Sequence, residues 1–292
     1  MRHPRILLGF AALAPLFAPP ASAEPLYTTE GTDPPFATVQ EKSGGKVGDR
    51  FNQGGALGSR VRVDHEALQK QAGKAGPIPD AIHIHTQFSG SIPRKDFAQW
   101  TRWYQEDGNV QVFRLFKGEQ NVRNGDGKDG SPGRVEAFTV PALTVAPGTW
   151  REYEATYTIV KPVAACIFQL MHAGNDDKGT PLLWPVHVDM GGNGEVVVLR
   201  RRPAAGEEKR VVIAENMTGK SFSLRVRANG EAYEVYHKPA TGDGPWKLAA
   251  KGTYAKAKAN QISFRWGMYC GSKKGQTVPN DGLLFVTGVA VK

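Results

Sequence analysis

Residues 263–271 read Ser-Phe-Arg-Trp-Gly-Met-Tyr-Cys-Gly, and this stretch has the two-residue period of a β-strand. Successive side chains of a strand point to opposite faces. Arg265, Gly267 and Tyr269 therefore share one face, while the apolar side chains between them share the other. The stretch predicts a strand that packs an apolar face into a core and presents a cation and a phenol on its other face.

The same alternation continues through most of the chain from about residue 79 onward. Turn sequences such as Asn193-Gly194 and Asn229-Gly230 separate the alternating segments. Many short strands at this spacing predict an all-β domain over residues 79–292, built as a sandwich of two antiparallel sheets. The expected strands are 82–88, 111–117, 134–140, 152–160, 165–171, 186–190, 195–201, 211–214, 221–227, 232–237, 261–269 and 283–291.

The first residues have the pattern of an export signal. Arg2 and Arg5 precede an apolar run over 6–18, and Ala21-Ser22-Ala23 fits a small-x-small cleavage site. The run is shorter than the roughly 20 residues of a membrane span. We expect a signal peptide over 1–23, a secreted or periplasmic protein, and no membrane association. Residues 24–78 are rich in Gly, Pro and charge, which predicts an irregular N-terminal segment with a short helix near 65–71.

The chain is basic, with 37 Lys and Arg against 28 Asp and Glu and a net charge of +9. The signal would remove Arg2 and Arg5, which leaves +7. A strongly basic exported protein tends to bind polyanions. Both nucleic acid and acidic polysaccharide are polyanions, and export favours the polysaccharide. We expect no nucleic-acid partner and a monomeric protein.

Three strand segments carry a resemblance to a known family. They are 134–138 (Arg-Val-Glu-Ala-Phe), 169–172 (Gln-Leu-Met-His) and 264–269 (Phe-Arg-Trp-Gly-Met-Tyr). Together they resemble the alginate lyases of polysaccharide lyase family 7 and related glucuronan lyases, over roughly residues 110–292. The family motifs read Arg-(Ser/Thr)-Glu-(Leu/Val)-Arg, Gln-(Ile/Val)-His and Tyr-Phe-Lys-x-Gly-x-Tyr-x-Gln, in the same order. The resemblance implies a β-jelly-roll (concanavalin-like) sandwich that cleaves a uronate polymer by β-elimination.

The sequence departs from the family pattern at three positions. Phe138 replaces the last Arg of the first motif, and Gly271 replaces the final Gln of the third. Met171 stands where the family has its histidine, and His172 follows one step later. Other histidines that could serve the site are His83 and His85, which share the polar face of an early strand.

The resemblance also implies roles for individual residues. Removing the C5 proton of a uronate requires a base, and groups near the carboxylate must stabilise the enediolate that develops. The implied catalytic residues are Tyr269 for proton transfer, with Arg134, Gln169 and His172 at the carboxylate. The implied substrate-binding residues are Arg265, Glu136, His83 and His85. No HExxH or paired CxxC motif exists, so we expect no metal and no other cofactor.

Alternatives remain open at this point. A non-catalytic carbohydrate-binding sandwich would have the same fold, and a fold alone does not fix function. Arg134 and Glu136 could form a structural ion pair, and Gln169 could satisfy a backbone group. The placement implied by the motifs also predicts a disulfide, because Cys166 and Cys270 each lie an odd number of residues from a site residue, on strands that must be close.

Overall fold

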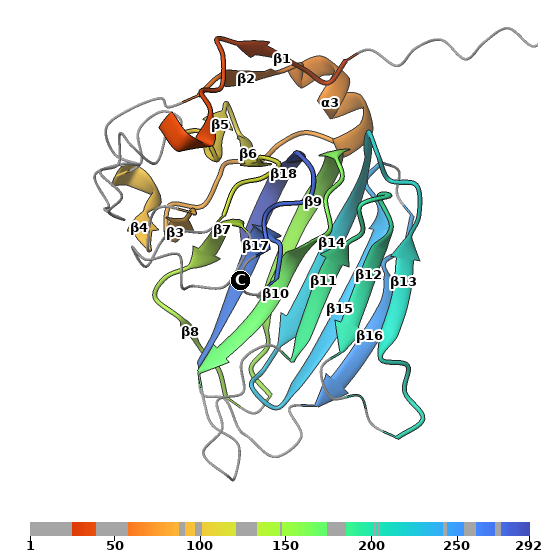
Figure 1. The fold of residues 1–292 in the computed structure, drawn as a ribbon. Helices are drawn as coiled ribbons and strands as arrows, with labels where there is room; N and C mark the ends of the chain where they lie inside the picture. Colours follow the sequence, from red (N-terminus) through yellow and green to blue (C-terminus); the bar gives the residue numbers. More distant parts are fainter. Residues whose placement is uncertain are drawn as a thin grey trace, which may run out of the picture.

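The computed structural model describes residues 25–38, 58–87, 91–96, 101–120, 133–146, 148–173, 185–200, 203, 205–241, 244–253, 261–271 and 276–292. Over these residues the chain forms two large packed antiparallel sheets and a small two-stranded sheet near the N-terminus (Figure 1). This confirms the predicted all-β sandwich. The expected signal peptide over 1–23 lies outside the described residues. Among the described helices, none is long and apolar enough to cross a membrane.

Within the described residues, one sheet has nine strands and carries the residues singled out above; we call it the site sheet. Its order is β13 (Arg210–Ala214), β12 (Val196–Arg200), β11 (Val186–Met190), β10 (Ala165–Ala173), β17 (Gln261–Tyr269), β7 (Arg134–Thr139), β3 (Ile82–His85) and β4 (Ile92–Pro93), with β8 (Leu143–Thr144) beside β17 and the short 3-10 helix η1 (Arg94–Asp96) after β4.

The other sheet, the back sheet, has seven strands in the described part of the chain. Its order is β16 (Lys247–Thr253), β15 (Ala232–Pro239), β14 (Lys220–Ala228), β9 (Arg151–Lys161), β18 (Gly282–Val291), β6 (Val110–Leu115) and β5 (Tyr104–Asp107).

The alternating apolar positions of both sheets fill the core between them. Phe264, Trp266 and Met268 of β17 are at most 1% exposed. The ring of Trp266 lies 5.3 Å from that of Tyr153 on the back sheet, and its indole N–H donates to Gln111 Oε1 at 2.9 Å. The indole thus buries its apolar surface while its N–H group keeps a hydrogen-bond partner. The predicted apolar face of β17 is therefore part of the core.

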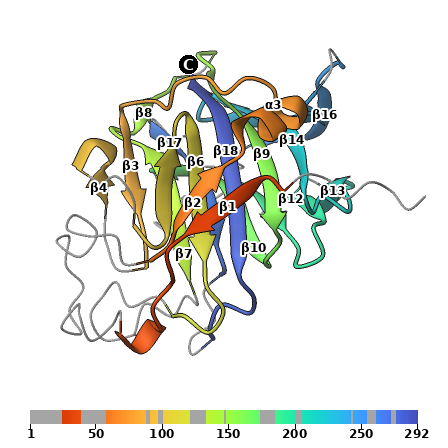
Figure 2. The ribbon, with the colours of Figure 1, turned by 90° about the horizontal axis from the view of Figure 1, so that it is seen from above.

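The N-terminal segment adds a thin layer over the outer face of the back sheet (Figure 2). It consists of β1 (Tyr27–Glu30), β2 (Arg60–Val63) and α3 (His65–Ala72), and the Asp64 side chain caps the helix by accepting from the N–H of Ala67 at 2.9 Å. Weak periodicity concealed the two strands, whereas the helix lies where one was expected. The layer shares a second apolar cluster with the back sheet, made of Val61, Val63, Leu68, Ala72, Val110, Val112, Leu283 and Phe285.

Candidate active site

The face of the site sheet that points away from the core, the site face, brings Arg134 and Tyr269 together. The two residues are direct partners on the adjacent strands β7 and β17. The guanidinium carbon of Arg134 lies 4.6 Å from the centre of the Tyr269 ring. Both side chains are half-buried, so they remain accessible from the site face. An accessible tyrosine next to an arginine is one of the residue types that general acid–base catalysis uses.

Gln169 of β10 and Glu136 of β7 are linked across the strand that separates them. Nε2 of Gln169 donates to Oε1 of Glu136 at 2.8 Å, and the two residues are only 5% and 3% exposed. Gly267 is the partner of Glu136 on the intervening strand β17. Its φ is +125°, and a Cβ there would lie 2.3 Å from the carbonyl oxygen of Val135. Glycine is therefore required at this point, and no side chain stands between Gln169 and Glu136.

Arg265 joins this group, and the two early histidines border it on β3, where His85 is the direct partner of Glu136. Arg265 is the partner of Gln169, and its guanidinium carbon is 4.6 Å from the ring centre of Phe138. His83 and His85 pack against the same Phe138 ring at 6.0 and 6.5 Å. They belong to β3, three strands from β10, which corresponds to about 14 Å at the usual strand spacing.

The second motif lies on β10, and it places Met171 at the position where the family has its histidine. Leu170 is in the core, so Met171 lies on the site face with Gln169. His172 pairs with Ile262 along the backbone. The side chain of His172 lies outside the described residues, and its role stays a prediction.

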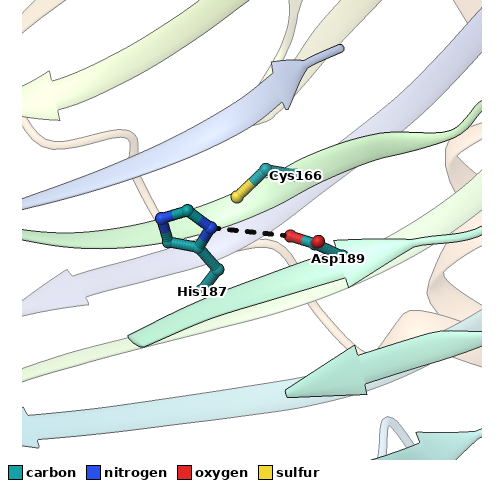
Figure 3. A group of neighbouring side chains, drawn as sticks. All are labelled: Cys166, His187 and Asp189. Atoms are coloured by element: carbon teal, nitrogen blue, oxygen red, sulfur yellow. Dashed lines mark ion pairs between the residues drawn. The ribbon is translucent and has the colours of Figure 1, made fainter. Parts of the chain in front are cut away.

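A pocket of about 510 Å³ opens on the site face beside Tyr269, and sequence reasoning missed three of its residues. They are Cys166, His187 and Asp189, and His187 is the direct partner of Gln169. Each offers a ligand atom within 4.8 Å of the others, so together they could hold a metal ion (Figure 3). The sequence pattern could have indicated the two residues of β11, because His187 and Asp189 alternate with its buried apolar residues and so share its outer face.

The predicted disulfide is wrong, because Cys166 and Cys270 are both free. Strand β10 has a register shift between Cys166 and Phe168, seen in its pairing with both neighbours. A β-bulge of this kind breaks strict alternation. Ile167 and Phe168 both enter the core, and Cys166 instead lies in the group with His187 on the site face. Cys270 packs against the core cluster.

Burial dominates the titration of the groups around the pocket. Burial, followed by the nearby carboxylates of Asp189 and Glu136, raises the pKa of the Cys166 thiol. Burial also raises the pKa of Asp189, and the Cys166 thiol beside it offsets this only in part. The pKa of Cys270 is raised to about 12 by burial. Farther along the face, burial lowers the pKa of His83, with Asp96 opposing.

Comparison with known proteins gives a result in structure and none in sequence. No protein-family model matches the chain, and no curated protein matches it. The solved structure of the marine PL7 alginate lyase AlyA1 from Zobellia galactanivorans is similar, with a TM-score of 0.56 and 14% identity over 75% of this chain and 97% of that one. The chain has the fold of the family 7 alginate lyases.

Two further structures agree with this result. Alginate lyase A1-II′, a member of polysaccharide lyase family 7, has a TM-score of 0.50 and 10% identity over 73% of this chain and 94% of its own. Alginate lyase AlyC3 has a TM-score of 0.50 and 10% identity over 73% and 90%. The expected jelly-roll architecture is confirmed, and at these identities the shared property is the fold.

Proposed function

We propose that the protein is a secreted or periplasmic polysaccharide lyase that cleaves a uronate polymer, alginate or glucuronan, by β-elimination. The observation that supports this most strongly is the arrangement of Arg134, Gln169 and Tyr269 on one face of the site sheet. These are the residue types that the reaction requires, and they occupy the motif positions of lyases with this fold.

In the proposed reaction Tyr269 transfers the proton. Its oxygen, in the phenolate form, takes the proton from C5 of the uronate and becomes a phenol, and the electron pair of that C–H bond forms the C4–C5 double bond. The C4–O glycosidic bond breaks, and the leaving oxygen receives a proton from Tyr269. The Arg134 guanidinium, 4.6 Å from the Tyr269 ring centre, is close enough to stabilise negative charge on the phenol oxygen.

Neutralisation of the uronate carboxylate falls to the groups beside Tyr269. Arg134 and Arg265 supply positive charge, and Gln169 supplies an amide. Glu136 holds Gln169 in place through the 2.8 Å hydrogen bond, which makes it a positioning residue as well as part of the proposed binding surface. We propose His172 as a further group at the carboxylate.

The remaining basic residues suit the rest of an acidic polymer. His83 and His85 lie about 14 Å from β10 by strand spacing. His85 is also the direct partner of Glu136 on β7, so the two histidines would contact the polymer on the β3 side of the proposed site. The net charge of +7 that remains without the expected signal peptide would attract the polymer over a longer range. We propose that the protein acts as a monomer, without nucleic acid or membrane as partner.

One assay separates the lyase from its alternatives. The protein is incubated with alginate, glucuronan and a neutral glucan, and ultraviolet absorbance of the unsaturated product is followed together with new reducing ends. We expect both signals to rise with a uronate polymer and neither with the glucan. Reducing ends without absorbance would indicate a hydrolase. Saturable binding without either signal would indicate the carbohydrate-binding alternative, for which Met171 at the family's histidine position is the main argument.

A further inference from the structure

The group formed by Cys166, His187 and Asp189 has the composition of a transition-metal site. It combines a thiol sulfur, an imidazole nitrogen and a carboxylate oxygen, all within 4.8 Å of one another. Figure 3 shows the three side chains turned toward a common point, with His187 Nδ1 4.0 Å from Asp189 Oδ1. Zn²⁺ accepts all three ligand types, and three protein ligands leave its fourth tetrahedral position open.

The fold holds the three ligands in place. His187 and Asp189 are two residues apart on β11, so they share a face, and Cys166 is the direct ladder partner of Asp189. The bulge between Cys166 and Phe168 turns the sulfur to this face. The thiol donates to the carbonyl oxygen of Phe168 at 3.1 Å. Two paired strands therefore fix the ligand positions before any ion arrives.

The surroundings favour a bound cation over a purely structural cluster. Asp189 Oδ1 is buried and accepts no hydrogen bond within the described part of the chain. Its nearest counter-charge is Nδ1 of His187 at 4.0 Å, which is charged only when protonated, so a bound divalent ion would compensate the oxygen more fully. The pocket of about 510 Å³ in front of the cluster leaves room for the ion and for an additional ligand.

We propose that Cys166, His187 and Asp189 bind one Zn²⁺ or a similar thiophilic divalent ion, with its fourth position open to the pocket. Water or an acidic sugar oxygen can occupy that position. Soft sulfur ligands select against Mg²⁺ and Ca²⁺, which prefer oxygen. The site does not depend on the lyase reaction, although Tyr269 lines the same pocket.

Cobalt titration of the reduced full-length protein tests the site. Co²⁺ is the probe, because a thiolate–cobalt bond gives near-ultraviolet charge-transfer absorption. We expect one Co²⁺ per chain with this absorption, displacement by Zn²⁺, and no displacement by Mg²⁺ or Ca²⁺. Cys166→Ser should abolish the absorption. It should also weaken Co²⁺ binding by more than about 10–100-fold, because the loss of a residue that only supports a ligand already has an effect of that size.

The second cysteine gives a matched control. Cys270→Ser should leave absorption and affinity unchanged, because Cys270 lines the same pocket but does not belong to the group of three ligand atoms. Asp189→Asn should weaken binding while the thiolate band remains. No saturable Co²⁺ binding, or a band lost in Cys270→Ser and kept in Cys166→Ser, would overturn the proposal.

A measurement on the unmodified protein covers the case in which Cys166→Ser does not fold. The reduced protein is treated with an alkylating reagent with and without Zn²⁺, and each cysteine peptide is quantified by mass. Zn²⁺ should slow alkylation of Cys166 at least tenfold and leave that of Cys270 unchanged. Equal rates at Cys166 with and without Zn²⁺ would refute the site.

Discussion

Arg134 lies against the ring of Tyr269, with 4.6 Å between the guanidinium carbon and the ring centre. The contact follows from the register of β7 and β17, in which the two residues are direct partners. A slip of one residue in that register would send one of the side chains into the core. The proposed chemistry therefore depends on correct strand pairing. Substituting Tyr269 tests the proposed proton transfer, and substituting Arg134 tests the contribution of the positive charge.

Tyr269→Phe should remove the reactive oxygen and retain nearly all the packing. General acid–base groups contribute about 10²–10⁴-fold to rate, so turnover should fall by that order while polymer affinity and melting temperature change little. Initial rates of unsaturated-product formation and a thermal melt check this. Tyr236→Phe on β15 of the back sheet is the matched control and should keep full activity. Near-normal turnover in Tyr269→Phe would remove it from the reaction.

Arg134→Ala should weaken both polymer binding and turnover, because the guanidinium would contact the uronate carboxylate in the ground state and in the transition state. A hydrogen bond to a charged group is worth about 1.5–3 kcal/mol, or about 10–100-fold in kcat/KM. Arg134→Lys should recover part of this, since it keeps the charge and loses the planar guanidinium. As a control, Arg225→Ala changes an arginine of β14 in the back sheet, which stacks on Trp246. Equal losses in both alanine variants would point to overall charge.

Met171→His would restore the family's Gln-x-His spacing on the site face. We expect turnover on a uronate polymer to rise by about tenfold, because one added charge-assisted hydrogen bond of about 1.5 kcal/mol at the carboxylate would lower the barrier by that amount. Met171→Leu, which keeps the apolar character, should leave turnover unchanged. A drop in turnover in Met171→His at normal stability would mean that this position does not face the carboxylate.

Gly267→Ala should destabilise the protein. The new Cβ would lie 2.3 Å from a backbone oxygen, at a φ of +125°. Backbone strain of this kind costs about 1–3 kcal/mol before the clash is counted, so we expect a loss of at least 2 kcal/mol by denaturant unfolding. Gly271→Ala is the control, because Gly271 also has a positive φ but, its chain neighbours aside, no atom of the described residues lies within 4 Å of its Cβ position. It should lose only about 1 kcal/mol. Equal losses would show that the close approach is unimportant.

Alternation in the sequence was sufficient to predict the sandwich and the faces of β17. Phe264, Trp266 and Met268 lie in the core, and Arg265 and Tyr269 lie outside it. Apolar and polar residues alternate along a strand when one of its faces packs in the core and the other faces the surface. The two N-terminal strands are short and charged, so their pairing could not be predicted from a local pattern.

Alternation predicted which side chains of one strand share a face, but it predicted neither the bulge in β10 nor which strands are neighbours. The bulge in β10 depends on pairing with both neighbouring strands, and nothing local marks it. Counting residues from Gln169 therefore placed Cys166 on the wrong face and led to the incorrect disulfide. His187 and Asp189 were missed for a different reason, because only the three-dimensional sheet places β11 beside Gln169.

The N-terminal layer makes the outer surface of the back sheet an interior. Val110 and Val112 on β6 and Leu283 and Phe285 on β18 sit side by side beneath β2 and α3, and each is at most 4% exposed. A chain shortened to begin at residue 79 would expose these apolar side chains to water. An exposed apolar patch of this kind promotes aggregation. The N-terminal layer thus covers an apolar surface, and we expect its removal to cause precipitation while the proposed catalytic residues on the site sheet stay in place.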